Sequence, residues 1–199
     1  MDLHKEYDKR KSEIVNRLED FKKVKGKDLF YELCFCILTP QSKAKNADYC
    51  ICEMKKDKFL ETGFNPTNIL KQKIRFHNNK GKYLLEVQKN YQDLRNKLDK
   101  IRDNREKRNF LVKSIKGIGL KEAGHFLRNT GHENLAILDR HILKHLAELK
   151  VIDEVPKTLT RKKYFEIEEK FLEFSEKVKI PMDHLDLLFW SMETGEIFK

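Results

Sequence analysis

Apolar residues recur every three or four positions along almost the whole chain. This spacing puts side chains on one face of an α-helix, and alternation typical of strands is absent. The pattern predicts an all-α protein. The expected helices cover residues 14–26, 29–38, 43–54, 66–76, 83–94, 102–115, 120–129, 140–149, 160–178 and 182–192.

Polar residues and prolines mark where several of these helices begin. Asp28 precedes the second helix and is a possible N-cap. The segment 39–42, Thr-Pro-Gln-Ser, ends that helix, and Ser42 can cap the next one. Pro66 suits the first turn of the helix expected through Phe76.

Charge then indicates the class of partner. The 199 residues have a formal net charge of +10, and 37% of them are charged. Such a balance favours a polyanion, nucleic acid first and an anionic membrane surface second. A lysine-rich surface of the kind found in thermophile proteins is the alternative. No apolar run approaches the roughly 20 residues that span a bilayer, and the beginning lacks a signal peptide's apolar stretch. We therefore expect a cytoplasmic protein without a membrane partner.

Cysteines and histidines do not form a convincing metal site. Cys34 and Cys36 lie in an apolar run, so buried thiols are expected there, and the four cysteines together have the wrong spacing for zinc. His141 and His145 are four residues apart on a predicted helix. No carboxylate or cysteine partner is fixed by spacing, so ordinary surface or core histidines are favoured.

The most informative segment is a tight turn between two predicted helices, Gly117-Ile118-Gly119. Two glycines let the backbone turn sharply and approach another molecule closely. Ile118 can pack between the helices. The free N–H groups at the start of the second helix, beside the glycine amides, then form an anion site suited to a DNA phosphate. An ordinary helical hairpin with a glycine C-cap is the alternative.

A lysine and an aspartate follow this turn. Lys121 falls in the first turn of the second helix. The positive end of the helix dipole disfavours the charged ammonium form there, and a lysine must be in its neutral amine form to act as a nucleophile. Asp139 comes 18 residues later, just before another predicted helix. Taken singly, Lys121 can be a phosphate contact and Asp139 an N-cap. Their spacing across a short loop favours a nucleophile with its carboxylate partner.

Residues 105–150 resemble the helix-hairpin-helix DNA glycosylase superfamily. Its motif reads Gly-hydrophobic-Gly-x-Lys-x-Ala, and this chain has Gly-Ile-Gly-Leu-Lys-Glu-Ala at 117–123. The resemblance implies that Lys121 is a Schiff-base nucleophile and Asp139 an essential carboxylate. Lysine at this position implies a bifunctional glycosylase that also nicks the strand. One departure is Ile137-Leu138, where the superfamily usually has Gly-Pro before the aspartate. The implied chemistry uses no metal and no other cofactor.

The target base is indicated by other parts of the chain. Relatives that attack oxidised pyrimidines generally carry four C-terminal cysteines for an iron–sulfur cluster, and no cysteine follows Cys52. The additional N-terminal domain of the eukaryotic 8-oxoguanine glycosylases is also missing. The segment 181–199 is similar to that of the compact archaeal 8-oxoguanine DNA glycosylases, the second Ogg family. The resemblance implies that this protein excises 8-oxoguanine.

That resemblance also implies a base pocket containing Trp190 and Lys199. Trp190 offers a stacking face for a purine, and a core anchor is an equally good interpretation. Lys199, as the last residue, would otherwise be a solvated end. Asp183 can accept hydrogen bonds from a flipped guanine or cap its helix. Gln41 stands where relatives insert a polar side chain into the gap left by the flipped base, and a plain loop residue is the alternative.

The resemblance further implies two helical subdomains flanking a cleft, with the hairpin at its mouth. Residues 24–129 form one, and 1–23 with 130–199 form the other, which would carry the catalytic aspartate and the base pocket. We expect a monomer that acts on double-stranded DNA containing a damaged base. Two alternatives stay open: the same chemistry on an oxidised pyrimidine or an abasic site, and a hairpin module that binds DNA without catalysis.

Overall fold

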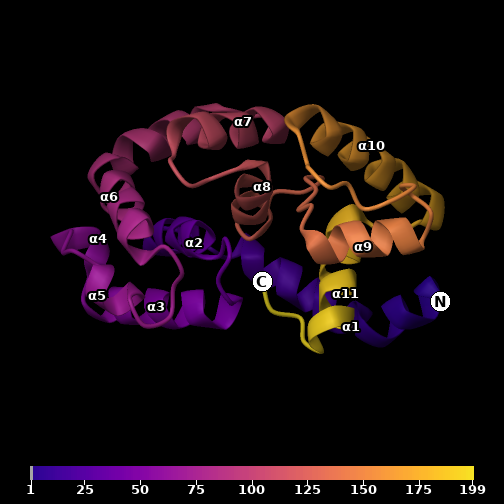
Figure 1. Ribbon diagram of the computed structural model, residues 1–199, viewed down its shortest axis with the longest axis horizontal. Coiled ribbons are helices and arrows are strands. Elements are labelled where there is room, and N and C mark those ends of the chain that lie inside the picture. The colour runs from indigo at the N-terminus through magenta and orange to yellow at the C-terminus, as the bar shows by residue number, and fades with distance from the viewer. Residues whose placement is uncertain (1) are drawn as a thin grey trace. The chain divides into compact units, whose positions relative to one another are not determined.

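A computed structural model describes residues 2–199, and this part of the chain is built from α-helices without a strand (Figure 1). The expectation of an all-α protein is confirmed. The helices are α1 (Leu3–Lys22), α2 (Lys27–Leu38), α3 (Ala44–Lys56), α4 (Phe59–Thr62), α5 (Thr67–Leu70), α6 (His77–Lys100), α7 (Asn104–Ser114), α8 (Leu120–Arg128), α9 (Arg140–Glu148), α10 (Arg161–Val178) and α11 (Met182–Thr194).

The chain divides into two compact units. One comprises residues 24–126, and the other comprises residues 1–23 together with 127–199. The unit expected to end at residue 129 ends at residue 126, so the boundary between the units falls inside α8. The hairpin turn and Lys121 belong to the first unit, and Asp139 and the C-terminal helix belong to the second.

The unit of residues 24–126 is organised around α2. Every residue of this helix from Phe30 to Leu38 is buried, because its apolar run is packed on more than one side. Helices α3 and α6 pack against it, and α6 in turn contacts α5 and α7. Burial of so continuous an apolar surface is the main stabilising contribution in a helical unit.

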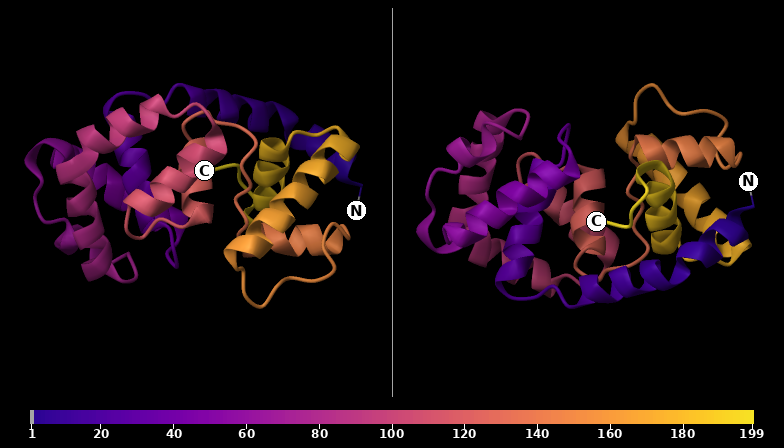
Figure 2. Two further views of the ribbon diagram at one scale, coloured as in Figure 1. Left: turned by 90° about the horizontal axis from the view of Figure 1, so that it is seen from above. Right: turned by 90° about the horizontal axis from the view of Figure 1, so that it is seen from below.

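In the other unit, α11 is the central helix. It contacts α1, α9 and α10, and the same three helices lie around it in the two further views of Figure 2. Its buried face includes Leu185, Leu188 and Phe189, and the ring of Phe189 stacks on that of His145 from α9. Residues 1–23 and 127–199 therefore share one core, although a hundred residues separate them in the sequence.

Several expected helix boundaries differ in the structure. Asp28 is not an N-cap but lies in the first turn of α2, which follows Gly26. Ser42 does not cap α3 either, since Lys43 occupies that position. The helix expected from Pro66 through Phe76 is reduced to the short α5, and α4 was not expected at all.

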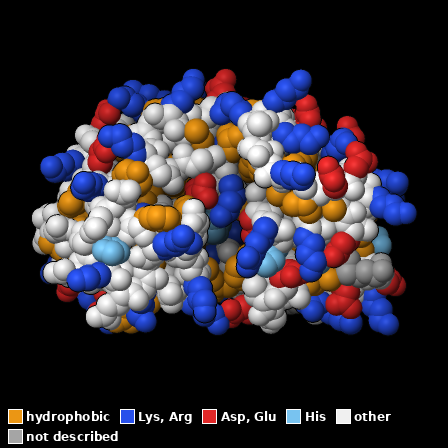
Figure 3. Space-filling model, viewed as in Figure 1, with side chains coloured by type: hydrophobic (Ala, Val, Ile, Leu, Met, Phe, Trp, Pro, Cys, Tyr) orange, Lys and Arg blue, Asp and Glu red, His pale blue; other side chains and the backbone are white. Residues whose placement is uncertain are grey.

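Lys and Arg side chains are spread over the face of the molecule shown in Figure 3. This distribution agrees with the net charge of +10. Among the described residues, no helix combines the length and the apolar character needed to cross a membrane.

Candidate active site

The hairpin joins α7 to α8 through the turn expected from the sequence. Gly117 adopts a φ of +84°, which favours glycine because other residues meet steric resistance there. A Cβ atom at this position would lie 2.6 Å from Cδ2 of Tyr83 on α6. The structure therefore favours glycine at position 117 for two reasons. The backbone has a positive φ, and the Tyr83 ring leaves no room for a Cβ atom.

Ile118 fixes the turn to the core. Its side chain is 5% exposed, and its amide donates to the carbonyl oxygen of Ile115 at 3.4 Å. Ile115, Ala123 and Phe126 are buried as well. The packing role expected of Ile118 is thus met within the unit of residues 24–126.

The beginning of α8 presents backbone donors. The carbonyl oxygen of Gly119 accepts the first helical bond, from the amide of Ala123 at 2.9 Å, so Gly119 occupies the N-cap position. The amides of Leu120, Lys121 and Glu122 donate to no acceptor within residues 2–199. Such free donors at the positive end of a helix attract an anion.

The Gly119 amide itself is occupied. It donates to Oε2 of Glu122 at 3.1 Å, so the third residue of the helix reaches back to the N-cap. This is the second half of a capping box. The other carboxylate oxygen, Oε1, lies 3.4 Å from Nζ of Lys121. Glu122 therefore joins the turn to the lysine, a relationship that the sequence analysis missed.

Lys121 lies in the first turn of α8 with 30% of its side chain exposed. Its ion pair with Glu122 is its one charged contact among the described residues. The side chain is thus partly exposed, and its residue lies among those whose backbone amides are free at the start of α8. A nucleophile that acts on a DNA backbone needs both properties.

Asp139 is the N-cap of α9. Its Oδ1 accepts hydrogen bonds from the amides of His141 at 2.8 Å and Ile142 at 2.9 Å. Its Oδ2 has no hydrogen-bond partner in the part of the chain that the structure describes. One oxygen is thus used by the helix, and the other is free to accept a further bond or to stabilise a positive charge.

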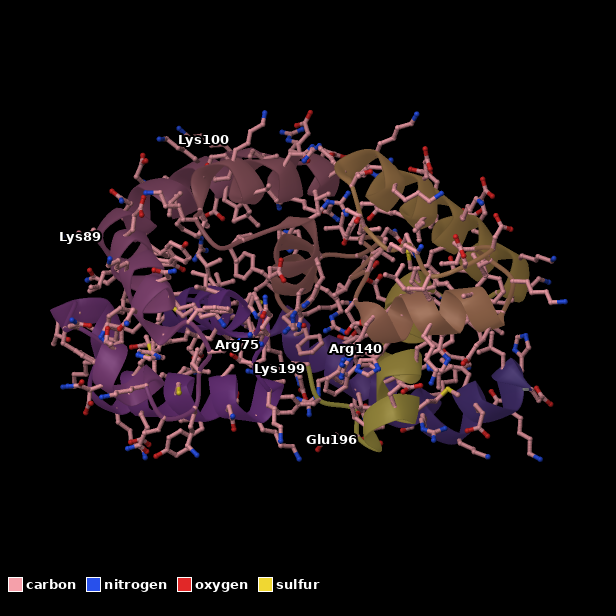
Figure 4. The ribbon with its side chains drawn as sticks, viewed as in Figure 1. Arg75, Lys89, Lys100, Arg140, Glu196 and Lys199 are labelled. Carbon is pink, nitrogen blue, oxygen red and sulfur yellow. The ribbon has the colours of Figure 1, made fainter. Side chains whose placement is uncertain are left out.

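The residues expected in the base pocket lie near the end of the chain. Trp190 on α11 is partly exposed rather than fully buried. Figure 4 shows Glu196 and Lys199 on the segment that follows α11, and Arg140 at the start of α9. Nζ of Lys199 lies 5.9 Å from the centre of the Phe198 ring.

Asp183 differs from the others because it is only 5% exposed. Its Oδ2 accepts a hydrogen bond from the amide of Asn134 at 3.0 Å, and its Oδ1 has no partner among the described residues. Burial raises the pKa of this carboxyl to about 6. It does not cap its own helix, which begins after Pro181.

Gln41 is exposed on the loop between α2 and α3, with a left-handed φ of +55°. The loop is held by a buried lysine of α6. Nζ of Lys80 donates to the carbonyl oxygens of Leu38 at 2.8 Å and Pro40 at 2.6 Å, and to Oγ of Ser42 at 3.2 Å. Lys80 explains why Ser42 is not available as an N-cap.

Phe76 was missed by the sequence analysis as a candidate. It directly precedes α6, has a φ of +58°, and is 50% exposed. The guanidinium of Arg75 lies 5.0 Å from the centre of its ring. An apolar ring at helical spacing resembles a core residue in sequence, and no local signal shows that this one faces solvent.

No cluster of three or more potential metal ligands occurs within residues 2–199. His145 is buried, and desolvation lowers its pKa. Both His145 and His141 approach the carboxylate of Glu193, at 3.2 Å and 3.5 Å. Cys34, Cys36 and Cys50 are buried and outside any disulfide, and Cys52 is exposed.

The sequence and the fold are similar to those of known repair enzymes. The profile described as 8-oxoguanine DNA glycosylase (Ogg-HhH) matches residues 14–180. An 8-oxoguanine DNA glycosylase/AP lyase of Fusobacterium nucleatum is 48% identical, over 100% of this chain and 96% of its own length. The chain belongs to the 8-oxoguanine DNA glycosylase family.

Members of this family from other organisms extend the similarity to solved structures. The Methanocaldococcus jannaschii 8-oxoguanine glycosylase/lyase, in complex with a 15mer DNA containing 8-oxoguanine, matches with a TM-score of 0.86 and 37% identity, over 100% of both chains. The enzyme of Thermotoga maritima matches with a TM-score of 0.85 and 33% identity, over 99% of this chain and 96% of its own. The similarity thus covers archaeal and bacterial members of the glycosylase family.

Proposed function

We propose that this protein excises 8-oxoguanine from double-stranded DNA and then cleaves the strand at the resulting abasic site. The observation that carries this proposal is the position of Lys121. Its side chain is partly exposed in the first turn of α8, which follows a hairpin with free backbone donors, in a chain of the 8-oxoguanine DNA glycosylase family. A binding module would not need a nucleophile at this place.

The proposed reaction begins when the damaged nucleotide leaves the base stack, because C1′ of its sugar is inaccessible in the duplex. The neutral amine of Lys121 attacks C1′, and the base departs with the electrons of the glycosidic bond. The nitrogen, now bonded to C1′, then loses a proton, and the C1′–O4′ bond breaks with a proton delivered to O4′, which opens the sugar and gives the imine. The imine acidifies C2′, so loss of a proton there expels the 3′ phosphate by β-elimination. This sequence requires no metal or redox cofactor.

Asp139 is proposed to act through its free carboxylate oxygen. As Oδ1 accepts two helix amides, the side chain is held in one orientation. Oδ2 is then available to stabilise the positive charge that develops on the sugar as the base leaves.

We propose that the hairpin holds DNA by its phosphates rather than by the edges of its bases. Gly117, Ile118 and Gly119 form the turn that brings the backbone close, and the amides that follow are suited to one phosphate oxygen or more. Trp190, Lys199 and Asp183 are the candidates for the base pocket. We further propose that the protein acts as a monomer in the cytoplasm, associated with DNA.

Two exposed side chains are candidates to fill the gap left by the flipped base, Gln41 and Phe76. Both have left-handed backbone conformations beside the ends of helices. An aromatic ring stacks on bases without regard to their sequence. The residue that fills the gap should, on replacement by alanine, slow excision from a duplex more than from a single strand.

The proposal is tested by borohydride reduction during incubation with a duplex that contains one 8-oxoguanine. We expect a covalent protein–DNA adduct with wild-type protein and none with Lys121→Gln. DNA binding by the variant, measured in parallel, controls for folding. A protein that binds but forms no adduct would be a binding module, and an adduct only with other lesions would assign a different substrate.

A further inference from the structure

Glu122 occupies an unusual position for a residue that directly follows a nucleophile. Consecutive side chains on a helix point in directions about 100° apart and normally do not meet. Glu122 meets Lys121 because its other oxygen is tied back to the Gly119 amide at 3.1 Å. The tie holds Oε1 at 3.4 Å from Nζ of Lys121.

The carboxylate of Glu122 lies so close to Gly119 that a larger residue at position 119 would collide with it. A Cβ atom built there would lie 2.9 Å from Oε2 of Glu122. Glycine at 119 thus leaves room for the carboxylate as well as for the turn. The Glu122 side chain is 14% exposed, half the exposure of the Lys121 side chain beside it.

A second lysine lies in the same electrostatic environment. Lys80 is 5% exposed, and burial lowers its pKa to about 8; the charge of Glu122 opposes this change and that of Lys121 adds to it. All three of its N–H bonds are directed at oxygen atoms of residues 38–42. Lys80 is therefore not available to react with a substrate.

The reaction proposed above, on which this inference rests, needs a base. The ammonium of Lys121 must lose a proton before its nitrogen can attack C1′, and Oε1 of Glu122 is the carboxylate oxygen paired with it. We infer that Glu122 accepts the proton of Lys121 and so generates the nucleophile. The N–H bond breaks, an O–H bond forms on Oε1, and the nitrogen lone pair then attacks C1′. The proton on Glu122 afterwards neutralises the departing base, which restores the carboxylate.

Replacement by glutamine separates this role from capping. The amide oxygen of Glu122→Gln can still accept from the Gly119 amide, so the hairpin should keep its structure, but it cannot take a proton. We expect the single-turnover rate of adduct formation at saturating DNA to fall by about 10²- to 10⁴-fold. DNA affinity should be no weaker than that of the wild type. Glu122→Asp, which keeps a carboxylate, should react faster than Glu122→Gln.

Glu86→Gln is the matched control. Glu86 pairs with Lys116 of the same hairpin at 3.1 Å, and both side chains are largely exposed. This change also removes one negative charge near the turn, and we expect an unchanged rate. Thermal melts of each variant establish that it is folded.

Two results would overturn the inference. One is a Glu122→Gln rate equal to wild type, which would leave Glu122 as a cap. The other is an equal slowing in Glu122→Gln and Glu86→Gln, which would indicate a general effect of charge. In both cases the wild-type adduct would still support the glycosylase proposal, whereas its absence would reject that proposal instead.

Discussion

The ammonium nitrogen of Lys80 lies 2.6 Å from the carbonyl oxygen of Pro40, and this contact fixes the loop that carries Gln41. The lysine is 5% exposed and comes from the fourth residue of α6. A buried charge of this kind is tolerated because every N–H has an acceptor. The same burial makes the stability of the loop depend on pH.

The first prediction concerns this dependence. Burial lowers the pKa of Lys80 to about 8, below its unfolded value of 10.5. The unfolded chain therefore binds more protons between these two values, and the free energy of unfolding should rise with pH in that window. We expect Lys80→Met to remove a rise of up to about 3 kcal/mol. Urea denaturation of both proteins across this pH range measures the difference.

Lys89→Met is the control for Lys80, because Lys89 is an exposed lysine of the same helix (Figure 4). Its replacement should leave the pH dependence as in the wild type. A stability difference between wild type and Lys80→Met that stayed constant with pH would argue against the buried charge.

The second prediction concerns Gly117. Alanine there must adopt a φ of +84° and place its Cβ 2.6 Å from the Tyr83 ring. Gly195→Ala is a matched control, since its φ is +82° and nothing lies within 4 Å. We expect a loss of about 1–2 kcal/mol for Gly195→Ala and a further 1–3 kcal/mol, roughly, for Gly117→Ala. Denaturation curves report both losses.

Tyr83 decides whether the extra loss at Gly117 is steric. Adding Tyr83→Ala to the Gly117→Ala variant should recover part of it, once the loss from Tyr83→Ala alone is subtracted. Equal losses at the two glycines would show that the ring moves aside freely.

The third prediction separates the two uses of Asp139. Asparagine is as good an N-cap as aspartate, so Asp139→Asn should change the free energy of unfolding by only about 0.5 kcal/mol or less. It should nevertheless slow excision by about 10²-fold or more, because the negative charge that we propose to stabilise the developing positive charge on the sugar is lost. Single-turnover excision and denaturation, run on the same preparation, give both numbers. An unchanged rate would leave Asp139 with a capping role alone.

The fourth prediction concerns Asp183. Burial raises its pKa to about 6, above the unfolded value of 3.8. Its favourable contribution is present below pH 3.8 and is lost as the pH rises through about 6, so the ionised carboxylate destabilises the fold at neutral pH. We expect Asp183→Asn to gain about 1–2 kcal/mol over wild type near pH 8 and nothing near pH 4. Chemical denaturation at the two pH values provides the comparison.

Excision by the Asp183→Asn variant bears on the base pocket. If Asp183 contacts the flipped base, the variant should be more stable yet slower. A rate equal to that of wild type would show that Asp183 only stabilises the loop that contains Asn134, through its bond to the Asn134 amide.

The helices could be predicted because their information is local. The spacing of residues such as Leu84 and Val87 shows which face of α6 is buried, whatever that face packs against. The glycine turn is local in the same way. Gly117 has a positive φ, as a sharp turn requires, and Ile118 is buried beneath it. The candidate nucleophile and its hairpin therefore followed from a few consecutive residues.

The expectations that were wrong concern residues whose structure depends on contacts with distant parts of the chain. Ser42 has the right chemistry and place for an N-cap, but its hydroxyl serves Lys80 and the Arg75 amide, more than thirty residues away. Phe76 fitted the apolar period of a helix, yet the helix stops before it. The sequence next to Ser42 and Phe76 does not indicate either outcome. The same holds for the bond between Asp183 and the Asn134 amide, which spans 49 residues.

The bond between Glu122 and the Gly119 amide has a consequence for DNA affinity. The hairpin carries its own anion, and a phosphate that is to bind this amide must first displace it. Binding is then an exchange of one acceptor for another, so the measured affinity is smaller than the strength of the amide–phosphate contact itself. A small anion in solution would meet the same acceptor at Gly119 without the other contacts that a DNA backbone could supply, so we expect the turn to bind it more weakly than a polymer.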